Sequence, residues 1–320
     1  MSRAGRILIG ISGWRYKGWR GSFYPEDLPH RRELEFAAQH FDTIELNGSF
    51  YSLQRPQNYK QWHDETPDDF TFAVKGSRYI THMLKLNNAE APLSNFIAQG
   101  LLRLGKKLGP ILWQFPPQFA FNPEKLQNFF DLLPRTQSEA ARLARRHDQR
   151  LKGRSWLQIE ADIPIRHAIE IRHASCECPE FIAILRKSRI ALVVADTVEW
   201  PLLMDVTADF VYCRLHGSEQ LYTSGYEADA IDTWARRVVL WSRGEEVTDG
   251  KKAHPRPAPK RRARDVYIYF DNDAKVRAPF DAEALRKRVL QLLSEDNGDS
   301  KRVVPAAVAP TKTTKRSIVG

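Results

Sequence analysis

Short apolar runs alternate with amphipathic stretches along most of the chain. Eight runs rich in Val, Ile, Leu and aromatic residues predict buried strands at 7–13, 43–47, 71–76, 109–115, 167–172, 190–196, 210–216 and 265–271. Between them, apolar residues recur three and four positions apart, which predicts helices over 31–41, 93–108, 123–133, 178–188, 230–241 and 280–293. Strands that alternate with helices in this way predict an α/β fold, an eightfold β/α barrel of the TIM type.

A doubly wound open sheet is the alternative fold, but no Gly-rich dinucleotide fingerprint follows the first strand. We therefore expect one barrel domain over residues 1–294. Within it, 135–155 is predicted to be a charged surface insertion that forms a helix, and 249–264 a flexible basic loop. Residues 295–320 are rich in Pro, Ala, Thr and Lys and are predicted to be a disordered basic tail.

Composition narrows the class of protein. With 42% hydrophobic and 28% charged residues, the 320-residue chain has the make-up of a soluble globular protein. No apolar run approaches the roughly 20 residues of a membrane helix, and the N-terminal stretch lacks the cleavage site of a signal peptide. Three cysteines, two of them only two positions apart, do not suit a disulfide framework. These features predict a cytoplasmic protein.

The formal net charge of +10 is unevenly distributed along the chain. The segments 135–154, 249–264 and 301–320 carry +5, +6 and +5, so the remainder of the chain is slightly acidic. Basic segments of this kind bind polyanions without sequence preference. Any contact with nucleic acid is therefore expected from the loop and the tail and not from the barrel.

Four of the predicted strands end in a pair of polar residues spaced two positions apart. Side chains two apart on a strand lie on the same face of the sheet, so both members of a pair point the same way. Burying such a pair costs several kcal/mol unless it is compensated. Because the C-terminal ends of barrel strands form the active-site face, we expect these residues to form a site there. The pairs are Glu45/Asn47, Glu170/Arg172, Arg214/His216 and Asp271/Asp273.

The chemistry of these residues suggests their roles. Carboxylates, histidine and lysine exchange protons, so the catalytic candidates are Glu45, Lys75, Glu170 and His216. Arginines, amides and aromatic rings suit an anionic ligand with a flat part, so the substrate-binding candidates are Trp14, Asn47, Tyr51, His82, Gln114, Arg172, Arg214, Tyr226 and Asp273. The alternative is structural, with Glu170–Arg172 and Glu45–Lys75 as buried ion pairs and Asp196 as the cap of a following helix.

Seven motifs follow one another along the chain: GISGWRYKGWRGSFYP, FDTIELNGSFYSL, FTFAVKGSRYITH, LGPILWQFPPQF, HAIEIRHAS, FVYCRLHGSEQLYTSGY and VYIYFDND. Together they resemble the YecE-like family, a bacterial and archaeal domain of unknown function, over about residues 7–293. The resemblance implies a single β/α barrel and supplies no established reaction. One departure is Cys176, which stands where the family usually has an aromatic residue; if that residue lines the pocket, the pocket is widened or altered here.

Three functions fit these residues. The first is an enzyme, a hydrolase or isomerase, that uses acid–base chemistry on a phosphorylated or carboxylated small molecule such as a sugar or nucleotide. The second is a hydrolase or nuclease that depends on a divalent metal, although the nearby arginines would repel a cation; its candidate ligands are Glu45, Glu170, His216 and Asp271. The third is a nucleic-acid-binding or adaptor protein. The sequence specifies neither a cofactor nor an oligomeric state.

Overall fold

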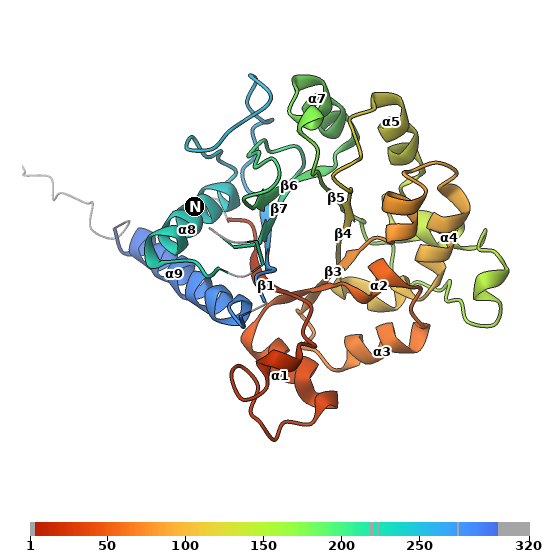
Figure 1. The fold of residues 1–320 in the computed structure, drawn as a ribbon, viewed down its shortest axis with the longest axis horizontal. Coiled ribbons are helices and arrows are strands. Elements are labelled where there is room, and N and C mark those ends of the chain that lie inside the picture. Colours follow the sequence, from red (N-terminus) through yellow and green to blue (C-terminus); the bar gives the residue numbers. More distant parts are fainter. Residues whose placement is uncertain (1–3, 218–220, 223, 274, 300–320) are drawn as a thin grey trace, which may run out of the picture.

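A closed barrel of parallel strands forms the centre of the molecule (Figure 1). The computed structural model describes residues 4–217, 221–222, 224–273 and 275–299. The strands pair in chain order, and β8 closes the ring against β1. They are β1 (Ile7–Ser12), β2 (Thr43–Leu46), β3 (Thr71–Lys75), β4 (Leu108–Gln114), β5 (His167–Glu170), β6 (Ala191–Asp196), β7 (Phe210–Leu215) and β8 (Asp265–Phe270). The predicted eightfold barrel is confirmed.

Helices surround the barrel on its outer side (Figure 1). They are α1 (Glu33–His40), α2 (Gly48–Tyr51), α3 (Pro56–Asp64), α4 (Glu90–Ala98), α5 (Pro123–Leu132), α6 (Gln137–Ala144), α7 (Pro179–Ser188), α8 (Ala228–Ser242) and α9 (Ala278–Asp299). Their starts follow from sequence chemistry: at α5, the Asn122 side chain accepts a hydrogen bond of 2.8 Å from the Lys125 amide. No helix in the described residues is long and apolar enough to span a membrane.

Alternation along the strands divides the core into two layers. One face of each strand packs against the helices, and the other fills the barrel with residues such as Leu112, Tyr212 and Tyr269. Each large apolar side chain that leaves water contributes about 1.5–3 kcal/mol. The same inner face continues upward from Tyr212 to Arg214 and from Tyr269 to Asp271. The apolar floor of the barrel therefore leads directly to a polar layer at its C-terminal end.

The sequence located all eight strands to within two residues at each end. One predicted helix, 93–108, is wrong, because α4 ends at Ala98 and a 3-10 turn runs from Leu101 to Lys107. The break falls at Gly100, which has a φ of +120°. A Cβ atom there would lie 2.5 Å from the Cα of Pro56, so only glycine fits this close approach.

The basic loop 249–264 packs against the body of the protein. The Asp205 carboxylate accepts hydrogen bonds from the backbone amides of Ala253 at 2.7 Å and His254 at 3.1 Å, and Glu246 accepts one from Ala258 at 2.9 Å. Asp205 belongs to the connection between β6 and β7, which forms no helix in the described residues. The loop thus covers a part of the barrel where the repeating pattern would place a helix.

Two other predicted segments differ in extent from the structure. The charged segment 135–155 contains the short helix α6 and a 3-10 turn at Gln149–Leu151, and Ala140 and Ala144 of α6 are fully buried. The helix α9 continues to Asp299, past the predicted domain end at residue 294. Residues 300–320, the greater part of the predicted tail, lie outside the described residues.

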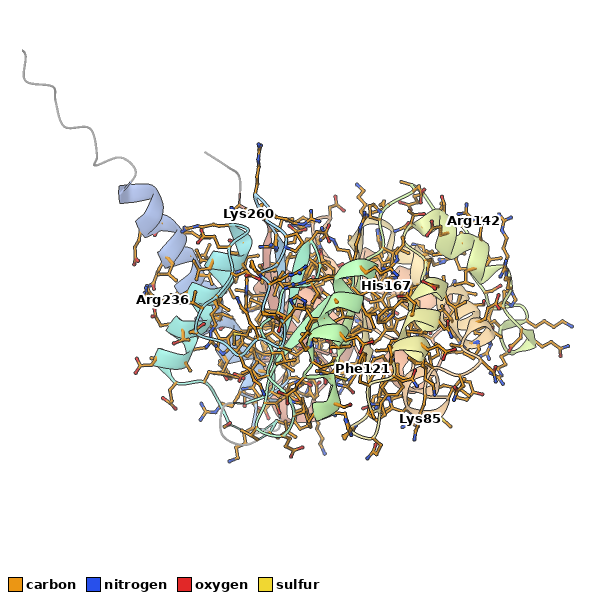
Figure 2. All side chains as sticks on the ribbon, turned by 90° about the horizontal axis from the view of Figure 1, so that it is seen from above. Lys85, Phe121, Arg142, His167, Arg236 and Lys260 are labelled. Carbon is orange, nitrogen blue, oxygen red and sulfur yellow. The ribbon has the colours of Figure 1, made fainter. Side chains whose placement is uncertain are left out.

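Arg142 of the segment 135–154 and Lys260 of the segment 249–264 lie away from the C-terminal end of the barrel (Figure 2). Figure 2 shows the barrel from the side, with Arg142 and Lys260 near the end at which β5 begins with His167. Lys85 and Phe121, which follow β3 and β4, lie near the opposite end. The labelled basic residues of these two segments therefore belong to the N-terminal face.

Candidate functional site

Inward-facing polar side chains meet at the C-terminal end of the barrel, which we call the mouth. Strand register brings them level, because Glu45 pairs with Ser12 and Glu170 pairs with Gln114 in neighbouring strands. Arg214 on β7 and Asp271 after β8 continue the inner faces of their strands to the same height. Regular pleating therefore places polar side chains that are as far apart in sequence as Ser12 and Asp271 around one centre.

Arg214 occupies this centre and is completely buried. Its guanidinium group contacts three carboxylates: Glu45 at 3.0 Å, Glu170 at 2.7 Å and Asp271 at 2.7 Å. We call these four residues the Arg214 cluster. Because its N–H groups are directed at these carboxylates, Arg214 has no free face for a substrate anion. These contacts favour a positioning role for Arg214 over its predicted substrate-binding role.

Further donors satisfy the two buried glutamates of the cluster. Glu45 accepts hydrogen bonds from the hydroxyls of Tyr212 at 2.6 Å and Ser12 at 2.7 Å. Glu170 accepts one from the Gln114 amide at 2.8 Å. Both glutamates are 0% exposed. Their oxygens are thus engaged by fixed partners, which does not suit the predicted role of general base.

The mouth carboxyls fall into two electrostatic groups. Burial alone would raise the pKa values of Glu170 and Asp271, but Arg214 and other nearby cations hold both below their usual values. Among the described residues, no cation lowers the pKa of Asp273. Burial, followed by repulsion from Asp271, raises the pKa of Asp273 to about 6. Asp271 therefore stays ionised while Asp273, two residues away, titrates near neutrality.

Arg172 lies at the edge of the cluster and remains partly accessible. Its Nε donates to Glu170 at 2.9 Å, and its guanidinium carbon lies 3.9 Å from the centre of the Trp200 ring. Nη2 is 3.4 Å from the Tyr222 hydroxyl, and the side chain is 13% exposed. The predicted Glu170–Arg172 ion pair is present. Stacking on Trp200 fixes the guanidinium plane and leaves part of it facing the mouth.

Lys75 and His82 lie around the Phe50 ring. Lys75 Nζ is 4.5 Å from the ring centre, and the His82 ring packs edge-on against it at 5.2 Å. Burial, followed by repulsion from Arg214, lowers the pKa of Lys75 to about 8. Burial, followed by repulsion from Arg172, lowers the pKa of His82 to about 4. The predicted Glu45–Lys75 ion pair does not form, since Glu45 contacts Arg214 instead.

His216 and Tyr226 lie beneath the mouth surface. His216 is fully buried, and its Nδ1 lies 3.1 Å from Asp271 Oδ2 without the alignment of a hydrogen bond. Tyr226 accepts a hydrogen bond from the Gly217 amide at 3.2 Å and is 7% exposed. Both side chains are therefore buried around the start of the loop after β7, where Tyr226 supports the Gly217 amide.

Two further predictions can be compared with the structure. Asp196 caps no helix; it accepts a hydrogen bond of 3.2 Å from Trp234 on α8. Cys176 is buried between the strands and the helices, where burial raises the pKa of its thiol to about 12. Cys176 therefore belongs to the core and is not among the residues that line the aromatic cavity of the mouth.

An aromatic cavity of about 350 Å³ adjoins the cluster. Its lining includes Trp14, Tyr16, Asn47, Tyr51 and Trp62. Asn47 Nδ2 donates to Ser12 at 2.9 Å, which connects the cavity with the hydrogen bonds of Glu45. Among the described residues, Trp14 Nε1 and Asn47 Oδ1 are buried without a partner. Neither atom is accessible to solvent, so the cavity offers an incoming ring its aromatic walls and not these two polar atoms.

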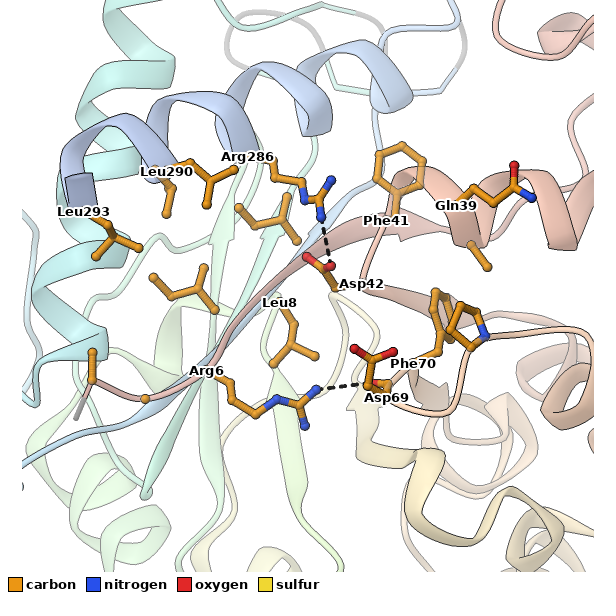
Figure 3. Close-up of a pocket in the computed structure, with 17 residues that line it drawn as sticks. Arg6, Leu8, Gln39, Phe41, Asp42, Asp69, Phe70, Arg286, Leu290 and Leu293 are labelled. Atoms are coloured by element: carbon orange, nitrogen blue, oxygen red, sulfur yellow. Dashed lines mark hydrogen bonds and ion pairs between the residues drawn. The ribbon is translucent and has the colours of Figure 1, made fainter.

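A second cavity, of about 520 Å³, lies at the N-terminal face between α9 and the starts of β1 and β3 (Figure 3). It is lined mainly by apolar side chains such as Leu8, Phe70 and Leu290. Its arginines are already engaged: Arg286 pairs with Asp42 at 3.2 Å, and Arg6 donates to the carbonyl of Asp69 at 3.2 Å. Burial raises the pKa of Asp42 in this lining, but Arg286 engages its carboxylate, so the candidate site remains the mouth.

The proposed metal ligands are separated by the guanidinium group of Arg214. Among the residues with described positions, no three His, Cys, Asp or Glu side chains are placed to hold one ion. Glu45, Glu170 and Asp271 each contact Arg214. This charge arrangement favours neutralisation by arginine over coordination of a cation.

Sequence reasoning missed Tyr212 and Trp200. Tyr212 lies two residues before Arg214, so the alternation of β7 could have placed it on the inner face. Trp200 lies in the connection after β6, and no local pattern indicates that it stacks on Arg172. Such a contact depends on tertiary structure.

Fold and site together define a β/α-barrel protein with a buried ionic cluster beneath its C-terminal mouth. Residues 8–303 match the family described as "Protein of unknown function DUF72", and the chain belongs to this family. It is 25% identical over 295 residues to the UPF0759 protein YunF of Bacillus subtilis, covering 90% of this chain and 94% of that protein. It is 28% identical over 131 residues to the UPF0759 protein YecE of Escherichia coli, which covers 40% of this chain and 44% of that protein.

Solved structures of family members share the fold. A DUF72 family protein from Thermotoga maritima aligns with a TM-score of 0.67 and 24% identity, over 89% of this chain and 99% of that one. Another, from Enterococcus faecalis, aligns with a TM-score of 0.60 and 18% identity, over 92% of this chain and 99% of that one. These likenesses confirm the barrel and assign no reaction.

Proposed function

We propose that this protein is an enzyme that performs acid–base chemistry on a small phosphorylated or carboxylated molecule at the barrel mouth. The observation that carries the proposal is the contrast between Asp271 and Asp273. One carboxyl stays ionised beside Arg214, while burial raises the pKa of the other to about 6. Titratable groups whose surroundings separate their pKa values are typical of acid–base sites.

Asp273 and Lys75 are the groups proposed to exchange protons. The pKa of Asp273 is raised to about 6 and that of Lys75 is lowered to about 8, so both change protonation near neutral pH. Glu45 and Glu170 are not retained in this role, because fixed donors engage their oxygens. Hydrolysis and isomerisation both need one proton donor and one acceptor, so both reaction classes belong to the proposal.

Arg172 is the proposed anion-binding group. It keeps an accessible part while Trp200 supports its plane, and a planar guanidinium binds phosphate or carboxylate in a bidentate manner. The aromatic cavity beside Asn47 is proposed to receive the ring of a sugar or base. An anionic group joined to a ring would thus extend from Arg172 towards Trp14.

Ligand titration tests the proposal. Inorganic phosphate, sugar phosphates, nucleoside monophosphates and small carboxylates would be titrated while tryptophan fluorescence is recorded, because Trp200 and Trp14 lie beside the two subsites. We expect saturable binding that Arg172→Gln weakens by about tenfold or more, since a charged hydrogen bond contributes about 1.5–3 kcal/mol.

Arg236→Gln is the matched control for this titration, because Arg236 is 63% exposed on α8. It should bind the same ligands as the unsubstituted protein. The proposal fails if no anion binds, or if the two substitutions weaken binding equally.

A further inference from the structure

The amine of Lys75 is held at the mouth without an ionic partner. Within the described residues, Nζ donates no hydrogen bond, and no carboxylate oxygen lies within the 4.0 Å of an ion pair. Nζ makes a cation–π contact with the Phe50 ring, 4.5 Å from the ring centre. Nζ is not among the fully enclosed polar atoms, and the residue is 8% exposed. A structural lysine would instead be expected to pair with one of the nearby carboxylates.

The carboxylates that could have paired with Lys75 are engaged by Arg214. Glu45, Glu170 and Asp271 attract Lys75 electrostatically, but burial and the positive charge of Arg214 outweigh them and lower its pKa to about 8. A lysine that is desolvated and close to another cation has a substantial fraction of neutral amine near neutral pH. The Arg214 cluster thus leaves a nucleophilic amine in an otherwise saturated ionic site.

We propose that Lys75 forms a covalent imine with the carbonyl carbon of an aldehyde or ketone that also carries a phosphate or carboxylate. This inference rests on the proposed function and names its substrate class more closely. Arg172 binds the anionic group, and Lys75 reacts with the carbonyl.

The chemistry of this step balances without an oxidant or a cofactor. The lone pair of Nζ attacks the carbonyl carbon, a C–N bond forms, and the carbonyl oxygen takes up a proton to give a carbinolamine. Nitrogen loses one proton at this stage. The hydroxyl then takes up a second proton and leaves as water as the C–O bond breaks, while the nitrogen lone pair forms the C=N bond and nitrogen loses its remaining proton. Asp273, whose pKa is raised to about 6, is the mouth carboxyl suited to supplying and accepting these protons.

Reductive trapping tests the inference. The full-length protein would be incubated with pyruvate or glyceraldehyde 3-phosphate and sodium cyanoborohydride, which transfers hydride to an imine carbon and fixes the adduct as a secondary amine. Intact mass and peptide mapping then locate the label. We expect one saturable adduct at Lys75, formed faster as the pH rises through about 8, where the amine loses its proton.

Matched variants separate Lys75 from ordinary surface amines. Lys75→Arg should lose the adduct, and Lys85→Arg should keep it, because Lys85 is an exposed lysine near the same end of the barrel. Circular dichroism would confirm that Lys75→Arg is folded. If that variant fails to fold, trapping in the unsubstituted protein alone decides the matter through the labelled position. Labelling confined to exposed lysines would overturn the inference.

The outcomes distinguish this inference from the proposed function. Anion binding that depends on Arg172, without an adduct at Lys75, would overturn the inference and leave the proposed function standing. An adduct at Lys75 whose saturation is unchanged in Arg172→Gln would support the covalent step and refute Arg172 as the anion-binding group. If no anion binds and no adduct forms at Lys75, both proposals are overturned.

Discussion

Replacing Arg214 with leucine tests whether the cluster holds the mouth together. Leucine retains much of the apolar volume but removes every contact to Glu45, Glu170 and Asp271. Breaking one buried ion pair by removing a single partner costs about 3–5 kcal/mol, because a buried charge is left uncompensated. Three such charges are affected here. Their costs will not add fully, since Glu170 keeps Arg172 and Glu45 keeps its hydroxyl donors.

We therefore expect Arg214→Leu to lose at least about 3–5 kcal/mol of unfolding free energy at about pH 8. The loss should shrink as the pH falls. In the unsubstituted protein the lowered pKa values of Glu170 and Asp271 stabilise the fold above their unfolded values, and this stabilisation is lost as the pH falls through the folded values. Without Arg214, burial dominates and the carboxyls protonate more readily. Lowering the pH therefore reduces the destabilisation of Arg214→Leu, whereas it destabilises the unsubstituted protein.

Urea unfolding followed by circular dichroism at about pH 5 and about pH 8 measures both quantities. Arg236→Leu is the control, because its exposed pair with Asp232 should contribute no more than about 1 kcal/mol at either pH. A loss below about 1 kcal/mol for Arg214→Leu at the higher pH would refute the reasoning. An equal loss at both pH values would refute its electrostatic part.

Three further predictions use the same measurements. Asp273→Asn should raise the melting temperature at about pH 7.5 and leave it unchanged at about pH 4, because the raised pKa of Asp273 makes its ionisation destabilising only above the unfolded value near 4; a lower melting temperature at the higher pH would contradict this. Gly100→Ala should cost more than about 1 kcal/mol, given its φ of +120° and the 2.5 Å approach to Pro56, and a neutral result would contradict the close packing. Truncation after Asp299 should preserve the unfolding transition and weaken salt-sensitive DNA binding, since residues 301–320 carry +5; unchanged DNA binding would argue against a role for the tail.

The fold was predictable from sequence because each strand carries its own signal. Continuous apolar runs mark the strands, and alternation then fixes which residues reach the mouth, as it does for Glu170 and Arg214. The break at Gly100 was not predictable, since it depends on the close approach of Pro56 from another part of the chain. Likewise, nothing local in the basic loop indicates that Asp205 anchors it where a helix would otherwise lie.

The roles within the site were harder to predict, because residue type does not show which charges neutralise each other. Glu45 and Glu170 have the chemistry of general bases, yet four fixed donors besides Arg214 contact them: Ser12, Tyr212, Gln114 and Arg172. Asp273 was predicted only to bind substrate, although it carries the raised carboxyl pKa of about 6. Sequence therefore located the mouth. Which of its charged groups neutralise each other could be assigned only from the distances between their side chains.

These charges explain why a buried ionic cluster is compatible with the proposed acid–base site. Burying Arg214 and its carboxylates is expensive, and a well-packed apolar layer could be equally stable. An apolar layer, however, could not keep Asp271 ionised beside Asp273, and it would lack the positive charge of Arg214 that helps to lower the pKa of Lys75. The cluster acts on its neighbours through charge. In addition to burial, Asp271 raises the pKa of Asp273 and Arg214 lowers that of Lys75, and Glu170 of the cluster also holds Arg172, the proposed anion-binding group. On this argument, substitutions in the cluster should alter the pH dependence of Lys75 trapping, whereas substitutions in the apolar floor should change stability alone.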